Sequence, residues 1–220
     1  MEETFRQFDN AMMPENRDIR EAALGELRGN WTQPVLTTLV YTLVVSAGSG
    51  LTAVIPGLGG LAFAFLLAAP LGFGFSITFL NYMRGIDRED MVGKPFMCFQ
   101  NYSRFLGVSA LTTLYTLLWT LLFIIPGIIK AYAYAMTPYI MQENPQLTAE
   151  SCIDASMKMM DGNKGKLFLL DLSFIGWAML CILTLGIGYL WLQPYMSCSR
   201  AKFYEELKSR KIGGESRNDW

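Results

Sequence analysis

Asp171 is the clearest candidate for chemistry, because its carboxylate lies about one helical turn inside an apolar run at residues 167–183. An acidic side chain inside a membrane segment is by default a candidate for binding a proton or a cation. The alternative is structural: Asp171 forms an ion pair near the helix ends with one of three basic side chains, Arg104, Arg200 or Lys202. The sequence favours the ion pair and leaves the functional role open.

Lys130 is the only basic residue inside a second apolar stretch, residues 123–141. Its ammonium group could attract an anionic headgroup or an anionic substrate. More often, such a lysine keeps its aliphatic stem in lipid and extends its amine to the membrane surface. We expect this second behaviour for Lys130.

Residue types for catalysis, metal binding and cofactor binding are sparse. The chain has no histidine, which removes the commonest metal ligand and the commonest general base. Its four cysteines show no Cys-x-x-Cys spacing, so neither a disulfide framework nor a metal site is expected. Glycines near residues 48–60 fit no phosphate-loop pattern. We therefore expect no catalytic residues, no cofactor and no enzyme activity.

Composition and charge point to a membrane protein without nucleic acid as a partner. The chain is 52% hydrophobic and 17% charged, whereas soluble domains carry about 25% charged residues. Several apolar runs exceed the roughly 17 residues that a helix needs to cross a bilayer core. The net charge of −1 gives no electrostatic reason to expect a nucleic acid.

The apolar runs predict an all-α polytopic membrane bundle of about six transmembrane helices. An amphipathic segment at residues 1–33 precedes a membrane domain at 34–204, and a charged tail at 205–220 is expected to fray. The six predicted spans are residues 34–54, 61–83, 105–125, 128–142, 167–183 and 189–204.

Glycines and prolines group these spans into three helical hairpins. The predicted turns contain Pro56 and Gly57, Pro126 and Gly127, and Gly186 and Gly188. Asn30, Asn101 and Asn163 each precede one hairpin, which indicates an internal repeat of about 60–70 residues. Because the turns are apolar, re-entrant hairpins that do not cross the membrane are the alternative.

Amphipathic helices are expected before each hairpin, on the cytoplasmic side. Their predicted ranges are residues 17–31, 94–104 and 148–161, and Thr148 has the residue type of an N-cap. With six spans, all of the 18 Lys and Arg residues except Lys130 fall on one side of the membrane. The positive-inside rule then predicts that both termini are cytoplasmic.

Several motifs resemble those of a bacterial family of integral membrane proteins, domain of unknown function 975. They are Leu27-Arg-Gly-Asn-Trp31, Ile125-Pro-Gly-Ile128, the segments 139–145, 156–162, 167–177 and 186–195, and Phe203-Tyr204. The resemblance covers nearly the whole chain and implies a helical protein of the bacterial cytoplasmic (inner) membrane. It implies no catalytic residues. The Pro-Gly hairpin and the helix that contains Ser156 are also similar to the membrane domain accompanying some glycerophosphodiester phosphodiesterases.

These observations predict a non-enzymatic scaffold or accessory protein. Its expected partners are membrane lipids and another membrane protein or a second copy of the chain. The alternative is a small transporter or channel built from the hairpin repeats. A transport path would need polar residues inside the spans, and the sequence offers few beyond Asp171, Gln193 and Asn81.

Overall fold

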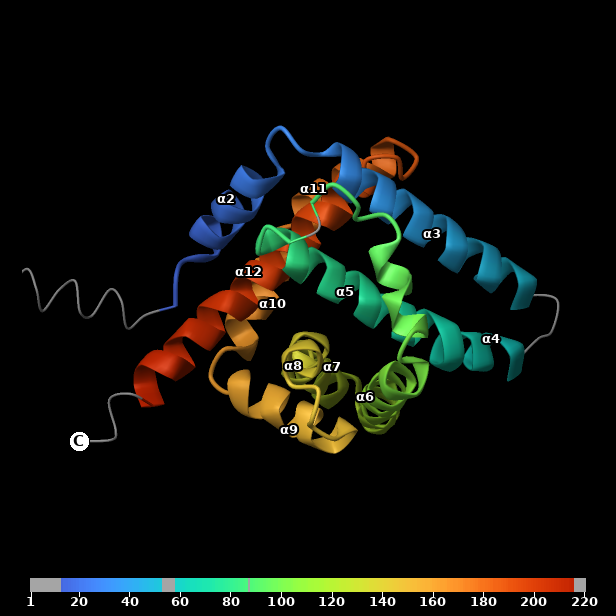
Figure 1. Cartoon of the computed structure of the whole chain (residues 1–220), viewed down its shortest axis with the longest axis vertical. Helices are drawn as coiled ribbons and strands as arrows, with labels where there is room; N and C mark the ends of the chain where they lie inside the picture. Colours follow the sequence, from blue (N-terminus) through green and yellow to red (C-terminus); the bar gives the residue numbers. More distant parts are fainter. Residues whose placement is uncertain (1–12, 53–57, 87, 216–220) are drawn as a thin grey trace, which may run out of the picture.

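The computed structural model describes residues 13–52, 58–86 and 88–215, and within these ranges the chain forms helices and turns without a strand (Figure 1). The predicted all-α class is therefore confirmed. The turn with Pro56 and Gly57 lies outside the described residues.

The first part of the chain forms a short helix and two long ones. Helix α2 covers Asn16–Leu27 and α3 covers Thr32–Thr52. Helix α4, Leu58–Phe63, continues through a π-helical segment η1, Ala64–Ala68, into α5, Ala69–Met83.

The π-helical segment ends two residues before Pro70, which explains its position. Proline has no amide hydrogen to donate to the carbonyl four residues earlier, so the carbonyl of Leu66 loses its usual partner. The hydroxyl of Tyr102 donates to that carbonyl at 2.6 Å. The start of the next long helix is thereby joined to the break.

The middle of the chain contains a 3₁₀ segment η2, Lys94–Phe99, and the helices α6, Tyr102–Leu122, α7, Ile124–Ala133, and α8, Thr137–Glu143. The predicted interfacial helix at 94–104 is thus only partly helical before α6 begins. The turn between α6 and α7 lies at Phe123, whose backbone is extended. The prediction that Pro126 and Gly127 form this turn is wrong, because both lie in α7.

The predicted span 128–142 is broken into α7 and α8. The break covers residues 134–136, ahead of Pro138, which cannot donate a helical hydrogen bond. Ser156 repairs the broken backbone pairing: its hydroxyl donates to the carbonyl of Ala133 at 2.8 Å and accepts from the amide of Met136 at 3.2 Å. Helix α9 therefore holds the break in place.

The last part of the chain contains α9, Ala149–Met159, α10, Lys164–Leu172, α11, Ile175–Leu183, and α12, Tyr189–Glu215. Thr148 is the N-cap of α9, as predicted, and accepts a hydrogen bond from the Ser151 amide at 3.3 Å. Helix α12 passes without interruption through residue 205, where the charged tail was expected to fray. That expectation is wrong up to Glu215.

Three helical segments in the described ranges are long and apolar enough to cross a membrane, judged by length and composition. They are Ala64–Met83, Tyr102–Leu122 and Lys164–Leu183. The last is the continuous path of α10 and α11, and the first joins η1 to α5. A membrane protein is the class that these segments indicate.

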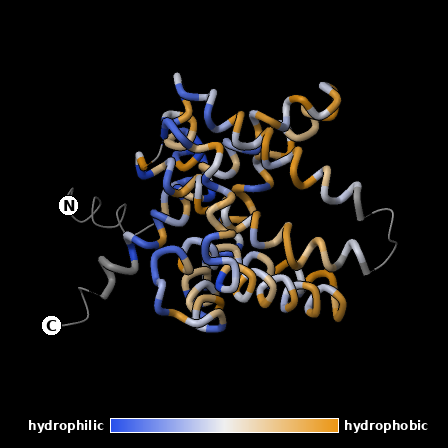
Figure 2. Tube along the Cα trace, turned by 45° about the vertical axis from the view of Figure 1, so that its right-hand side comes forward, coloured by the Kyte–Doolittle hydropathy of each residue, from blue (hydrophilic) through white to orange (hydrophobic). Residues whose placement is uncertain are grey.

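The helices splay rather than run parallel. In Figure 1, α3 and α5 run across the picture, whereas α6 is seen nearly end-on. Figure 2 shows hydrophilic residues gathered at the left of the molecule and hydrophobic helix ends pointing to the right. The buried core lies nearer the polar side, where α5, α8 and α12 contribute Leu80, Tyr139 and Phe203 to one cluster. The chain therefore has a polar, packed end and an apolar, open end.

Candidate functional site

Asp171 lies between three helices and is bound on two sides. Arg200 of α12 donates from Nε to Oδ1 at 3.1 Å and from Nη2 to Oδ2 at 2.8 Å. Tyr132 of α7 donates its hydroxyl to Oδ2 at 3.0 Å. The Asp171 side chain is 13% exposed, so α10 is held to α7 and α12 by a largely buried carboxylate. Of the three partners considered from sequence, the structure selects Arg200.

Arg104 does not pair with Asp171 but binds the C-terminal end of α8. Its Nη2 donates to the carbonyl of Met141 at 3.1 Å and to the carbonyl of Asn144 at 2.8 Å. Carbonyls at a helix C-terminus have no partner within the helix and attract cations. Arg104 therefore ties the start of α6 to the end of α8.

Lys130 packs against aromatic and sulfur groups. Its ammonium lies 5.0 Å from the centroid of the Trp119 ring on α6, within the range of a cation–π interaction. It also lies 3.8 Å from the sulfur of Met157 on α9. The ammonium group is thus held among α6, α7 and α9.

The glycines expected in the turns have different roles. Gly127 faces α6 so closely that an added Cβ would lie 2.5 Å from the Cα of Thr120. Gly186 has a backbone φ angle of +86°, a left-handed conformation that glycine takes without strain. Gly186 and Gly188 do form the predicted turn between α11 and α12. Gly127 instead permits close contact between two adjacent helices.

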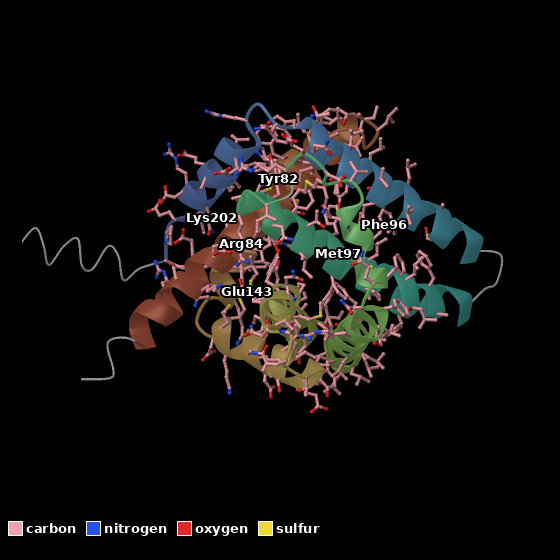
Figure 3. All side chains as sticks on the ribbon, in the orientation of Figure 1. Tyr82, Arg84, Phe96, Met97, Glu143 and Lys202 are labelled. Atoms are coloured by element: carbon pink, nitrogen blue, oxygen red, sulfur yellow. The ribbon has the colours of Figure 1, made fainter. Side chains whose placement is uncertain are left out.

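A second charged cluster, which sequence reasoning missed, surrounds Glu143 at the end of α8 (Figure 3). Its carboxylate pairs with Arg84 at the end of α5, accepts from the Tyr204 hydroxyl at 2.6 Å, and pairs with Lys208 at 2.8 Å. Arg84 also donates from Nε to Glu205 at 2.7 Å. The cluster joins α5, α8 and α12 at the polar side of the molecule.

The electrostatic environment of Glu143 favours its ionised form. Desolvation by the surrounding helices acts to raise the pKa of this carboxyl. Hydrogen bonds from Lys208, Tyr204 and Arg84 outweigh that effect and hold the pKa below the usual value for a glutamate. The network is therefore stronger with Glu143 charged.

Near the same side, α2 is attached to the end of α5. The hydroxyl of Tyr82 donates to the carbonyl of Glu26 at 3.1 Å. Arg88 pairs with the Glu26 carboxylate and lies 5.4 Å from the centroid of the Tyr82 ring. These contacts fix the amphipathic helix against the bundle.

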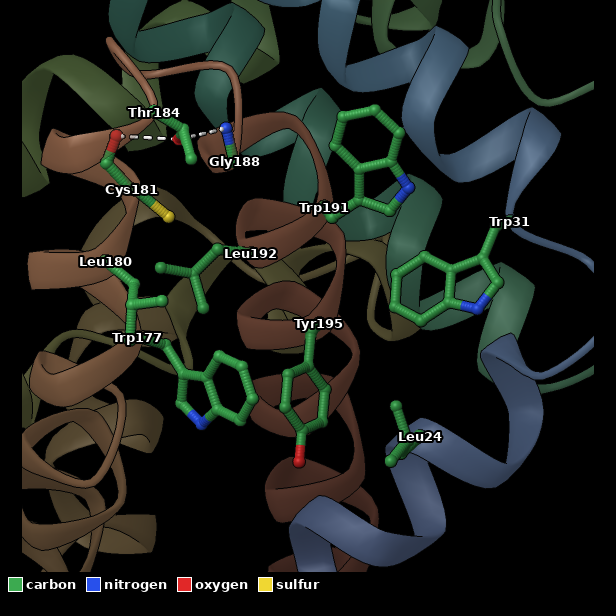
Figure 4. Close-up of a pocket in the computed structure, with 10 residues that line it drawn as sticks. All are labelled: Leu24, Trp31, Trp177, Leu180, Cys181, Thr184, Gly188, Trp191, Leu192 and Tyr195. Atoms are coloured by element: carbon green, nitrogen blue, oxygen red, sulfur yellow. Dashed lines mark hydrogen bonds between the residues drawn. The ribbon is translucent and has the colours of Figure 1, made fainter.

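An aromatic pocket of about 480 Å³ lies between α11, α12 and the junction of α2 with α3 (Figure 4). Trp177 lines it from α11, Trp191 and Tyr195 from α12, and Trp31 and Leu24 from the α2 side. Polar atoms in the lining are engaged locally: the Thr184 hydroxyl donates to the carbonyl of Cys181 at 3.0 Å and accepts from the Gly188 amide at 3.1 Å. The pocket suits an apolar ligand.

Metal ligands do not gather in the part of the chain that the structure describes: no group there contains three or more Asp, Glu, His or Cys side chains positioned for a metal. The charged clusters at Asp171 and Glu143 combine acids with basic and phenolic side chains. Both arrangements join helices and neither presents a nucleophile next to a base.

Residues 120–211 match the protein family described as Protein of unknown function (DUF975). The resemblance inferred from the motifs is thereby confirmed over this range, which includes α7 to α11 and most of α12. It contains Asp171 with its partners Tyr132 and Arg200, and it contains Glu143, whereas Arg84 of the Glu143 cluster lies outside it. No curated protein and no solved structure matches the chain.

The Glu143 cluster and the pocket were missed because their residues are distant in sequence. Arg84 and Lys208 lie 59 and 65 positions from Glu143. One local signal was available: Glu143 follows the apolar stretch 123–141 by two residues, and an acidic residue needs a cationic partner if it is buried there. The identity of that partner depends on how the helices pack.

Proposed function

We propose that this chain is a non-enzymatic scaffold or accessory protein of the bacterial cytoplasmic membrane, which binds membrane lipids and another membrane protein or a second copy of itself. The observation that carries the proposal is the separation of an apolar, exposed end from a packed, charged end (Figure 2). The family match identifies relatives of unknown function and assigns no activity.

Large apolar side chains at the ends of α6, α7 and α11 support placement in lipid. Leu121, Ile125 and Leu183 are 82%, 72% and 82% exposed. A soluble protein would hide such a surface, because each exposed apolar side chain costs roughly 1–3 kcal/mol relative to burial. In a bilayer the same surface faces hydrocarbon and needs no protein partner.

The charged clusters support a scaffold rather than an enzyme. Asp171 and Glu143 each accept hydrogen bonds from basic and phenolic side chains on neighbouring helices. Carboxylates whose oxygens are occupied by such hydrogen bonds fix the positions of the helices and make the polar side rigid. A rigid face with α2 and α9 on it is suited to contact a second protein.

The proposal includes six spans arranged as three hairpins, with both termini cytoplasmic. Basic residues are concentrated in the segments 84–104, 143–166 and 200–210. The proposed topology places these segments on the cytoplasmic side, in agreement with the positive-inside rule. Proline and neighbouring hydroxyls, as at Pro138 and Ser156, make broken helices tolerable in a membrane.

Cysteine labelling in intact cells tests the topology. Cys98, Cys152 and Cys198 are buried, and burial raises the pKa of Cys98 to about 11, so its thiol stays protonated. The half-buried Cys181 is first replaced by alanine. Gly59→Cys, Phe123→Cys and Ile187→Cys are then expected to react with an impermeant reagent added outside. Asp161→Cys, on the opposite side, is the matched control and reacts only after permeabilisation.

Reaction at Gly59, Phe123 or Ile187 only after permeabilisation would overturn the spanning topology and favour re-entrant hairpins. The scaffold role is tested by native mass spectrometry of protein gently extracted from its own membrane. A co-purifying membrane protein or a defined oligomer supports the role. A monomer with neither partner nor lipid contradicts it.

Transport is the second candidate function, and the burial of Asp171 among α7, α10 and α12 is the observation that favours it. Proton- or cation-coupled flux in liposomes that is abolished by Asp171→Asn, in a variant that still inserts and packs, would replace the scaffold proposal. Asp171→Asn that only lowers the melting temperature, with no flux in either protein, supports the structural role.

A further inference from the structure

A cationic side chain, Arg20 of α2, lies close to the aromatic pocket. Leu24, which lines the pocket, lies four residues after Arg20, so both side chains lie on the same face of α2. The Arg20 guanidinium carbon lies 6.0 Å from the centroid of the Phe174 ring. That ring meets Tyr195 of the pocket edge-on, with centroids 5.0 Å apart. Arg20 is therefore placed next to the wall formed by Tyr195.

The guanidinium of Arg20 has no hydrogen-bonded acid in the described ranges, although the exposed Glu21 next to it in sequence attracts it at longer range. Its buried Nε atom has no hydrogen-bond partner there, and its guanidinium forms no ion pair with a described carboxylate. The neighbouring acid on α2, Glu21, is engaged by Arg17 at 2.7 Å. A buried guanidinium nitrogen without an acceptor is costly, because desolvation is then uncompensated. An anionic group bound beside Tyr195 would remove this cost.

We propose that the pocket binds one acyl chain of an anionic phospholipid, with the lipid phosphate held by Arg20. This inference rests on the proposed function, since it requires the apolar end of the protein to lie in a bilayer. A guanidinium suits the task because its planar fork donates two parallel hydrogen bonds to a phosphate.

The shape of the pocket agrees with an acyl chain. Between Gly188 and Tyr195 the chain advances about 10 Å along the axis of α12, so the pocket accommodates part of one extended hydrocarbon chain. Trp177 and Trp191 are 58% and 47% exposed, so the pocket opens sideways where a lipid could enter. Figure 4 shows the Tyr195 hydroxyl pointing away from Trp191, toward the end where α2 lies. The apolar wall of the pocket thus matches the acyl chain of a phospholipid, and Arg20 at its end matches the phosphate.

The test is native mass spectrometry of delipidated protein in a neutral detergent. Equal amounts of phosphatidylglycerol and phosphatidylcholine with identical acyl chains are added, and the ratio of the two single-lipid adducts is measured. The wild type is expected to favour phosphatidylglycerol. Arg20→Gln should lower that ratio about tenfold, the effect of losing a charge-assisted hydrogen-bond pair. Arg20→Lys, which keeps the charge without the fork, should give an intermediate ratio.

Two further variants separate the headgroup from the acyl chain. Lys158→Gln removes a positive charge from an exposed position on α9, which does not line the pocket, and should leave the ratio unchanged. Leu24→Trp fills the pocket and should reduce the adducts of both lipids. Equal adducts in the wild type, equal effects of Arg20→Gln and Lys158→Gln, or binding unchanged by Leu24→Trp would each overturn the inference. So would a peptide retained in the pocket in place of lipid.

The variants are used only if they melt like the wild type and keep its labelling pattern. Protein that labels as a spanning bundle but shows no preference for the anionic lipid refutes the lipid site alone. Protein that fails the labelling test refutes the proposed function itself. The two failures are therefore distinguishable.

Discussion

Replacing Glu143 by glutamine is expected to destabilise the helix bundle, because it removes the charge at which α5, α8 and α12 meet. The Glu143 side chain is 15% exposed, while its partners Arg84 and Lys208 are 27% and 36% exposed. Loss of one partner from a buried ion pair costs roughly 3–5 kcal/mol, and from an exposed pair about 0–1 kcal/mol. The glutamine oxygen still accepts one hydrogen bond, and solvent screens Lys208. We therefore expect a loss of about 2 kcal/mol in the free energy of unfolding.

The dependence of stability on pH gives a second, independent test of the prediction for Glu143→Gln. The pKa of Glu143 is lower in the folded protein than in the unfolded chain. The unfolded chain therefore binds the proton more tightly, and acid favours unfolding. The stabilisation by Glu143 is fully present at pH 7 and falls as the pH drops through the folded-state pKa. Because glutamine does not titrate, the gap between wild type and Glu143→Gln should be constant above about pH 5 and shrink in more acidic solution.

Thermal unfolding in detergent, followed by tryptophan fluorescence at one scan rate, measures both effects. A loss of about 2 kcal/mol corresponds to a decrease of about 4–8 °C in the melting temperature for a chain of this size. The matched control is Glu21→Gln, which breaks the exposed pair with Arg17 on α2 and should change little. Equal melting temperatures for the two variants, or a gap that does not shrink in acid, would refute the reasoning.

Three more substitutions test individual contacts by the same melting assay. Asp171→Asn leaves the guanidinium of Arg200 without its carboxylate and should lower stability by about 2 kcal/mol, and adding Arg200→Gln should recover part of the loss. Ser156→Ala removes both hydrogen bonds at the break between α7 and α8 and should cost about 1–3 kcal/mol; an unchanged melting temperature would mean that the break is held by packing alone. Gly127→Val should separate α6 from α7, because its Cβ would meet the Thr120 backbone, and destabilisation no greater than for Gly165→Val, which has open space around it, would contradict this.

The two charged clusters explain how a chain with splayed apolar helices keeps a defined arrangement. Within a bilayer, lipid chains are as apolar as the side chains, so burial gives little preference for one helix packing over another. Asp171 with Arg200, and Glu143 with Arg84, join helices that are distant in sequence by directional contacts. We expect these contacts to fix the positions of α10 and α8 against α12 more than apolar contacts do.

The sequence predicted the long helices to within a few residues. The predicted spans 61–83 and 105–125 correspond to Leu58–Met83 and to α6, Tyr102–Leu122. Apolar length is a local property, so it is readable without the fold. The turn at Pro126 and Gly127 was misplaced because a proline is as acceptable in the first turn of a helix as between helices. The continuation of α12 beyond residue 204 was missed because its contacts are with distant residues: Glu205 pairs with Arg84, and Lys208 pairs with Glu143.

By itself, the sequence determined the all-α class, the apolar character of the long helices and the lack of histidine chemistry, since composition and periodicity are properties of contiguous residues. It also limited the partners of Asp171 to a few basic residues. Only the tertiary structure decided that Arg200 binds Asp171 while Arg104 binds the end of α8. The same is true of the Glu143 cluster and of the pocket lined by Trp31 and Trp177, because each requires residues tens of positions apart to meet. Those meetings depend on how the helices cross, which local sequence does not specify.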